Sequence, residues 1–139
     1  MSLIFTSVIF GQNISLPELI KLNNYSFDEF DTYVTKKEFK FNKNYTYRGE
    51  ETTVYAFYVN GKENTFIAKS TENVSVQTPN SSIYIRVKND LKELGFKYLD
   101  KTTDEKGFHL NYEKENIFVS ISSSTDSQNR PFYAIYVAK

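Results

Sequence analysis

The chain contains one short pattern twice, first as Lys36-Lys37-Glu38-Phe39-Lys40-Phe41 and then as Lys92-Glu93-Leu94-Gly95-Phe96-Lys97-Tyr98. In each copy, lysines close a stretch with helical spacing, and an alternation of aromatic and polar residues follows. Lysines near the end of a helix are favoured by the helix dipole. We therefore interpret both copies as the point where a helix ends and a sheet begins.

Capping signals predict where the helices start. Ser15-Leu16-Pro17-Glu18 and Ser26-Phe27-Asp28-Glu29 both have the serine and glutamate spacing of a capping box. A third helix is expected from about 82 to 94, because its apolar residues recur on one helical face. Gly95 suits the left-handed position that ends many helices.

Alternating aromatic stretches predict strands after each helical region. Thr53 to Val59 is the strongest such stretch, and it is followed by Asn60-Gly61, the preferred two-residue hairpin turn. Further strands are expected in the first half at 39–47, 65–69 and 74–77. Those of the second half are expected at 96–99, 108–112, 117–122 and 131–137.

Together these elements predict an α+β fold with two tandem helix-then-antiparallel-sheet units of the α-β-β-β-β type. We expect one domain over residues 12–139, with helices packed on a mostly antiparallel sheet, and units at about 15–78 and 79–139. This order resembles the architecture of the β-lactamase-inhibitor proteins. The resemblance is one of topology, so no functional residue follows from it.

Composition argues against several classes of function. The chain has 17 basic residues (lysine and arginine) and 17 acidic residues (aspartate and glutamate). It therefore lacks the basic excess of a nucleic-acid binder. The absence of cysteine excludes disulfides, thiolate metal sites and a cysteine nucleophile. His109 is the only histidine, and a catalytic or metal-binding histidine needs partners. We expect no catalytic residues, no metal and no cofactor.

The N-terminus predicts export. Leu3 to Phe10 is apolar and Gly11-Gln12-Asn13 is abruptly polar, which resembles the end of a bacterial secretory signal peptide. Residues 1–11 would then be a signal-peptide remnant, and the protein would be periplasmic or secreted. The alternative is a first core strand in a cytoplasmic protein that starts at Met1. The run is too short to span a bilayer as a helix.

The aromatic residues suggest a binding surface. They make up 17% of the chain, and both faces of the strand from Thr53 to Val59 are largely apolar. A single sheet with helices on one side leaves the other face exposed, and exposed aromatic residues anchor many binding surfaces. The candidate contact residues are Tyr45, Tyr47, Tyr55, Phe57, Tyr58, Tyr133 and Tyr136. The alternative is that both faces are covered, the second by the N-terminal segment or another subunit.

Our leading hypothesis is an exported, non-catalytic binding protein that contacts a protein or a cell-envelope component. A homodimer through the open sheet face would be a special case of this hypothesis. A second hypothesis is an intracellular immunity or inhibitor protein that blocks an enzyme. The least favoured hypothesis is a small hydrolase that uses His109 with a carboxylate.

Overall fold

The computed structural model describes residues 13–139, so the predicted signal-peptide remnant at 1–11 lies outside the described residues. The first half contains α1 (Leu16–Asn23), α2 (Phe27–Lys36), β1 (Lys40–Tyr47), β2 (Glu50–Val59), β3 (Lys62–Lys69) and β4 (Asn73–Thr78). The second half contains α3 (Ser81–Glu93), β5 (Lys97–Thr103), β6 (Phe108–Lys114), β7 (Ile117–Thr125) and β8 (Pro131–Ala138). The predicted α+β class, with helices preceding strands in both halves, is confirmed.

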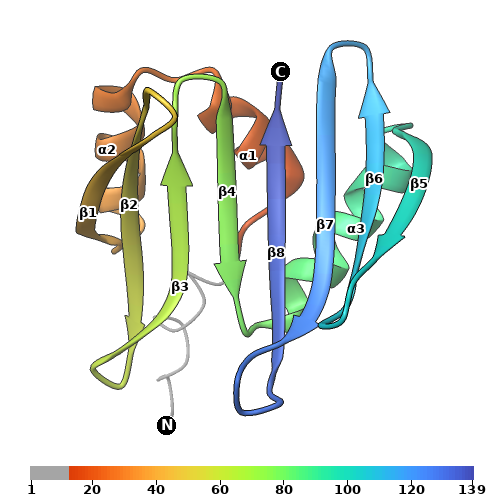
Figure 1. Ribbon diagram of the computed structural model, residues 1–139. Helices are drawn as coiled ribbons and strands as arrows, with labels where there is room; N and C mark the ends of the chain where they lie inside the picture. The colour runs from red at the N-terminus through yellow and green to blue at the C-terminus, as the bar shows by residue number, and fades with distance from the viewer. Residues whose placement is uncertain (1–12) are drawn as a thin grey trace, which may run out of the picture.

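The eight strands within residues 13–139 form one antiparallel sheet in the order β1-β2-β3-β4-β8-β7-β6-β5 (Figure 1). The last strands of the two halves, β4 and β8, are neighbours at the centre. The first strands, β1 and β5, form the two edges. The pairing of β4 with β8 therefore joins the two halves into one continuous sheet.

Helix caps and tight turns follow the local sequence. Ser26 Oγ accepts a hydrogen bond from Glu29 N at 3.1 Å, and Glu29 Oε1 accepts one from Ser26 N at 3.0 Å, which completes the predicted capping box. Asn60 and Gly61 have φ values of 53° and 76°, as the predicted hairpin turn requires. Gly95, at φ 78°, follows the last helical turn of α3.

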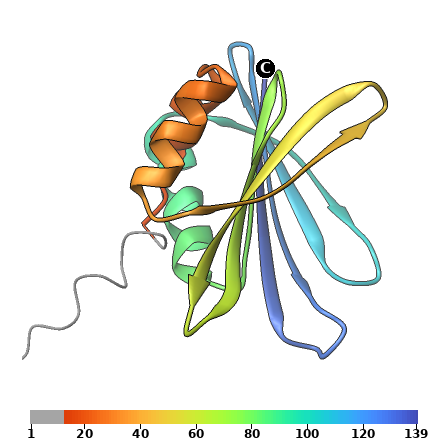
Figure 2. The same cartoon turned by 90° about the vertical axis from the view of Figure 1, so that its left-hand side faces the viewer.

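The three helices of the described part of the chain lie on one face of the sheet, and the core fills the space between helices and sheet (Figure 2). Leu16 N donates to Asp90 Oδ2 at 3.0 Å, which joins α1 to α3 across the two halves. Among residues 13–139, the largest fully buried apolar side chains come from the helices and from central strands: Leu16, Leu19, Phe30, Ile67, Ile83, Leu91, Ile121 and Ile135. No helix within residues 13–139 is long and apolar enough to cross a membrane.

Candidate binding surface on the open face of the sheet

The face of the sheet opposite the helices is the candidate site, and we call it the open face. Residues opposite each other on paired strands share a face, so the register identifies its members. One row crosses the sheet from β1 through β2, β3, β4, β8 and β7 to β6. It consists of Lys43, Val54, Ala68, Ser75, Tyr136, Ser120 and Asn111. The next row consists of Lys40, Ala56, Phe66, Gln77, Ala134, Ser122 and His109. Most of the central floor is therefore made of small side chains.

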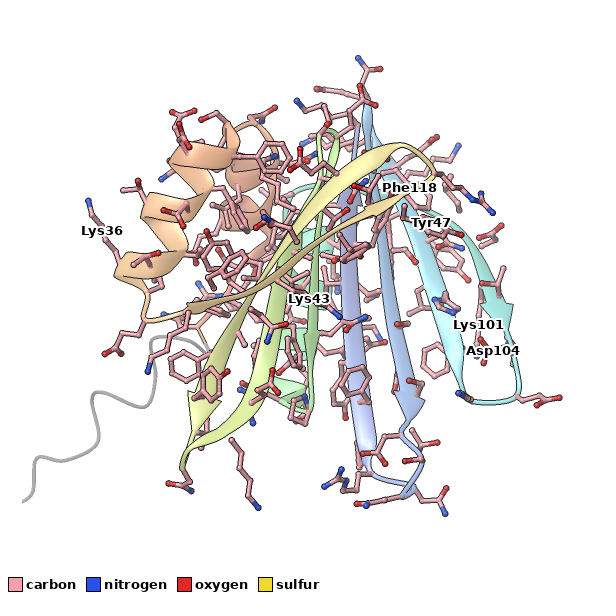
Figure 3. All side chains as sticks on the ribbon, turned by 60° about the vertical axis from the view of Figure 1, so that its left-hand side comes forward. Lys36, Lys43, Tyr47, Lys101, Asp104 and Phe118 are labelled. Carbon is pink, nitrogen blue, oxygen red and sulfur yellow. The ribbon has the colours of Figure 1, made fainter. Side chains whose placement is uncertain are left out.

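Four of the seven predicted contact residues lie on this face. Tyr45, Tyr47, Tyr58 and Tyr136 are exposed, with fractions from 38% for Tyr58 to 61% for Tyr47. In Figure 3, Tyr47 of β1 and Phe118 of β7 lie on the side of the sheet away from the helices, whereas Lys36 projects from α2. Phe118 packs against Tyr136, with ring centroids 6.4 Å apart.

The other three predicted residues face the helices, so the prediction that they belong to an exposed contact surface is wrong. Tyr55 and Phe57 are only 5% and 6% exposed and belong to the core. Tyr133 packs against Tyr84 of α3, with ring centroids 5.1 Å apart. The physical reason is the two-residue period of a strand, which sends Tyr55 and Phe57 to one face and Tyr58 to the other.

The sequence reasoning missed Lys43, Phe66 and Phe118 as open-face residues. Val59 and Lys62 pair on either side of the Asn60-Gly61 turn. Regular antiparallel pairing from this first pair would place Thr65 opposite Ala56. A bulge in β3 shifts the register, so Phe66 takes that place instead. The bulge carries no clear signature in the sequence. For Phe118, alternation along the strand from 117 to 122 was a usable signal, because it separates Phe118 from the core residues Val119 and Ile121.

The open face is concave. A bulge between Phe41 and Lys43 interrupts the pairing of β1 with β2, and a second lies between Tyr98 and Asp100 in β5. Bulges bend a strand and increase its twist. In Figure 2, the β1–β2 and β5–β6 hairpins both lean away from the helices, at opposite edges of the sheet.

Charges of both signs lie along the β1–β2 hairpin, at the edge of the sheet that leans away from the helices. Lys40 Nζ lies 5.7 Å from the ring centroid of Tyr58, and Lys43 Nζ lies 5.8 Å from that of Tyr45. The Arg48 guanidinium lies 5.1 Å from the centroid of the Tyr47 ring. Burial and the negative charge of Glu50 both raise the pKa of Tyr136 above its ordinary value, so the hairpin tip lies within electrostatic range of β8.

A cavity of about 390 Å³, which we call the open-face pocket, lies beneath this edge. Its lining comes from β1 to β4: Asn42, Lys43, Tyr45, Val54, Phe66, Ala68, Ser75 and Gln77. The volume falls within the range of about 300–1,000 Å³ that is typical of small-molecule sites. The site thus combines a broad concave surface with one defined hollow.

The opposite edge of the open face carries His109 beside Asp104. His109 Nε2 lies 3.6 Å from Asp104 Oδ2, with the His109 side chain 45% and the Asp104 side chain 60% exposed. The backbone N–H groups of Lys106 and Gly107 donate to Asp104 and hold its pKa below the ordinary value, with a further contribution from His109. Ser122 lies opposite His109, yet neither side chain hydrogen-bonds the other in the described chain. The arrangement is a solvent-exposed contact between an imidazole and a carboxylate, and contacts of this kind contribute little to stability.

Among residues 13–139, no group of three acidic or histidine side chains is arranged to hold a metal ion. Comparison of the chain with protein-family models, curated proteins and solved structures gave no match.

Proposed function

We propose that this protein is an exported, non-catalytic binding protein that holds a protein partner against the concave open face. The observation that carries the proposal is the gathering of Tyr45, Tyr47, Tyr58 and Tyr136 on a face that no described helix covers. Tyrosine combines a large apolar ring with a hydroxyl, and it is enriched at protein interfaces and among the residues that dominate binding energy.

The size of the open face favours a protein over a small molecule as the main partner. The eight described strands, at about 4.8 Å spacing, make a surface roughly 35 Å across. This matches the scale of a standard interface, which buries about 800 Å² on each partner. Small floor residues such as Ala68, Ser75 and Ala134 leave room for partner side chains between the aromatic rings.

Site-specific photo-crosslinking tests the proposal. A photo-reactive phenylalanine analogue is placed at Tyr47, Tyr58 or Tyr136, and the protein is exposed to extract or envelope fractions of its source cells. The matched control carries the analogue at Ile85 of α3, an apolar residue that is 55% exposed on the helix side. We expect one and the same protein to be crosslinked from the three open-face positions and not from Ile85.

Substitution of Tyr58 and Tyr136 by alanine provides the first prediction. We expect the double variant to bind the crosslinked partner at least tenfold more weakly, because both rings offer exposed contact area, and still to unfold cooperatively in urea. Binding is measured with purified partner. Crosslinking from Ile85 alone, or loss of cooperative unfolding in the double variant, would contradict the proposed role of this face.

Export is the second part of the proposal, and its support is the apolar run from Leu3 to Phe10 before Gln12. Intact-mass measurement of the native protein tests it. Loss of residues 1–11 supports export, whereas an intact N-terminus contradicts it. A crosslinked intracellular enzyme together with an intact N-terminus would instead favour an inhibitor protein that uses the same face.

A further inference from the structure

The open-face pocket has an apolar floor built from two neighbouring rows of the sheet. Val54 lies opposite Ala68 in one row, and Phe66 lies opposite Gln77 in the next. Val54 is buried, while the rings of Tyr45 and Phe66 remain partly accessible. A flat apolar group of a ligand can therefore rest on this floor and contact an aromatic ring.

Within residues 13–139, one positive charge lines this pocket and no carboxylate does. Lys43 is the only charged side chain among the described residues of the lining, and its Nζ lies 5.8 Å from the centroid of the Tyr45 ring. Glu63 does not line the pocket, and its Oε2 accepts a hydrogen bond from Asn42 Nδ2 at 2.9 Å. The hollow on the helix side of the same hairpin, of about 260 Å³, has the opposite character, because Asp28, Asp31 and Glu51 line it.

We propose that the open-face pocket binds a small organic monocarboxylate with an aromatic body. The carboxylate pairs with the Lys43 ammonium, and the body lies on Val54 and Ala68 beside Phe66. The amides of Asn42 and Gln77 offer hydrogen bonds at the sides. This inference goes beyond the proposed partner binding and does not depend on it.

Amide-detected NMR titration with benzoate and 3-phenylpropionate tests the proposal, with benzamide as the neutral analogue. We expect saturable shifts centred on residues 43, 54, 68 and 75 with the carboxylates and much weaker ones with benzamide. Lys43→Met should weaken carboxylate binding about tenfold, a change of about 1.4 kcal/mol. Lys40→Met is the matched control, since Lys40 also lies over a tyrosine ring of this face but does not line the pocket.

A second variant tests whether the ligand lies on the apolar floor of the open-face pocket. Ala68→Leu places a larger side chain at the bottom of the pocket and should abolish the shifts while leaving the rest of the amide spectrum unchanged. Absence of saturable shifts with both carboxylates, equal binding of benzamide, or equal losses in Lys43→Met and Lys40→Met would each overturn the proposal. Crosslinking from Tyr58 and Tyr136 would be unaffected by these results, so the two proposals fail separately.

Discussion

Lys69 of β3 carries an ammonium group beneath the helices, where the residue is only 1% exposed. Its Nζ donates to the backbone oxygen of Asn23 at 3.2 Å and lies 5.9 Å from the centroid of the Phe27 ring. One carbonyl and one ring replace only part of the hydration that the charge loses on folding. Burial, and to a smaller extent the positive charge of Lys139, therefore lower the pKa of Lys69.

This lowered pKa predicts a pH dependence of stability. Between the folded-state pKa and the ordinary lysine value of 10.5, the unfolded chain binds more protons than the folded protein, so stability rises with pH in that window. Lys69→Met removes the titrating group. The free energy of unfolding of the wild type, relative to that of Lys69→Met, should therefore increase from neutral pH to about 10.5.

Urea unfolding at a series of pH values measures this difference. The contributions of the other titrating groups cancel in it, because both proteins contain these groups. Lys62→Met is the control, because Lys62 lies in the same strand but is exposed. Its unfolding free energy should stay parallel to that of the wild type. Parallel curves for Lys69→Met as well would show that Lys69 titrates normally in the folded protein.

Among the strands, β6 and β7 approach closely at Gly107. A Cβ atom on Gly107 would lie 2.0 Å from the backbone oxygen of Ser123 and 2.8 Å from Ser124 Cα. The same residue closes the turn before β6, since its N–H donates to Asp104 Oδ1 at 3.0 Å. Glycine is required here because backbone atoms occupy the space that a side chain would need.

We predict that Gly107→Ala lowers the free energy of unfolding by about 1–3 kcal/mol, because the β7 backbone must move. Urea unfolding measures the loss, and hydrogen exchange should show weaker protection in β6 and β7. Gly49→Asn is the control: Gly49 has φ +78° with no atom near its missing Cβ, and asparagine tolerates that conformation. Equal stability of the two variants would contradict the close approach.

Over the whole molecule, one core serves both halves of the sheet. Ile135 of β8 is fully buried and lies opposite Val76 of β4 and Ile121 of β7. α1 contacts β4, β8 and α3, so a helix of the first half packs on strands of both halves. The two halves should therefore unfold together.

Ile135→Ala tests this cooperativity. The cavity left at the centre should lower the free energy of unfolding by about 2–5 kcal/mol. Hydrogen-exchange protection should fall equally in β2 and β6, which lie on opposite sides of β8. Ile85→Ala, at an exposed site of α3, should change stability by less than about 0.5 kcal/mol. Loss of protection in one half alone would show that the halves are separate units.

Local features of the fold were predictable because their interactions span only a few residues. Ser26 caps the helix that contains Glu29, and Gly61 and Gly95 adopt the positive φ values that their positions require. The order of helices and strands follows from such signals together with the periodicity of apolar residues. The start of α3 differed slightly, because Asn80 caps it by accepting from Ser82 N at 3.0 Å.

The candidate binding surface was only partly predictable. Tyr58 and Tyr136 were identified as aromatic strand residues, but so were Tyr55 and Phe57, which lie in the core. Both faces of these strands are apolar, so alternation alone does not indicate which face receives the helices. Lys43 stood out neither by residue type nor by spacing, and only the register places it on the rim of the pocket.

The sequence by itself thus determined the elements, their caps and their turns, because these depend on contacts between near neighbours in the chain. The tertiary structure alone decided three things: the pairing of β4 with β8, the side of the sheet that the helices cover, and the concavity of the other side. Each depends on contacts between residues far apart in the chain or on bulges that shift the strand register. A shift of one residue exchanges buried and exposed side chains, so the set of residues on the open face is decided only when that register is set.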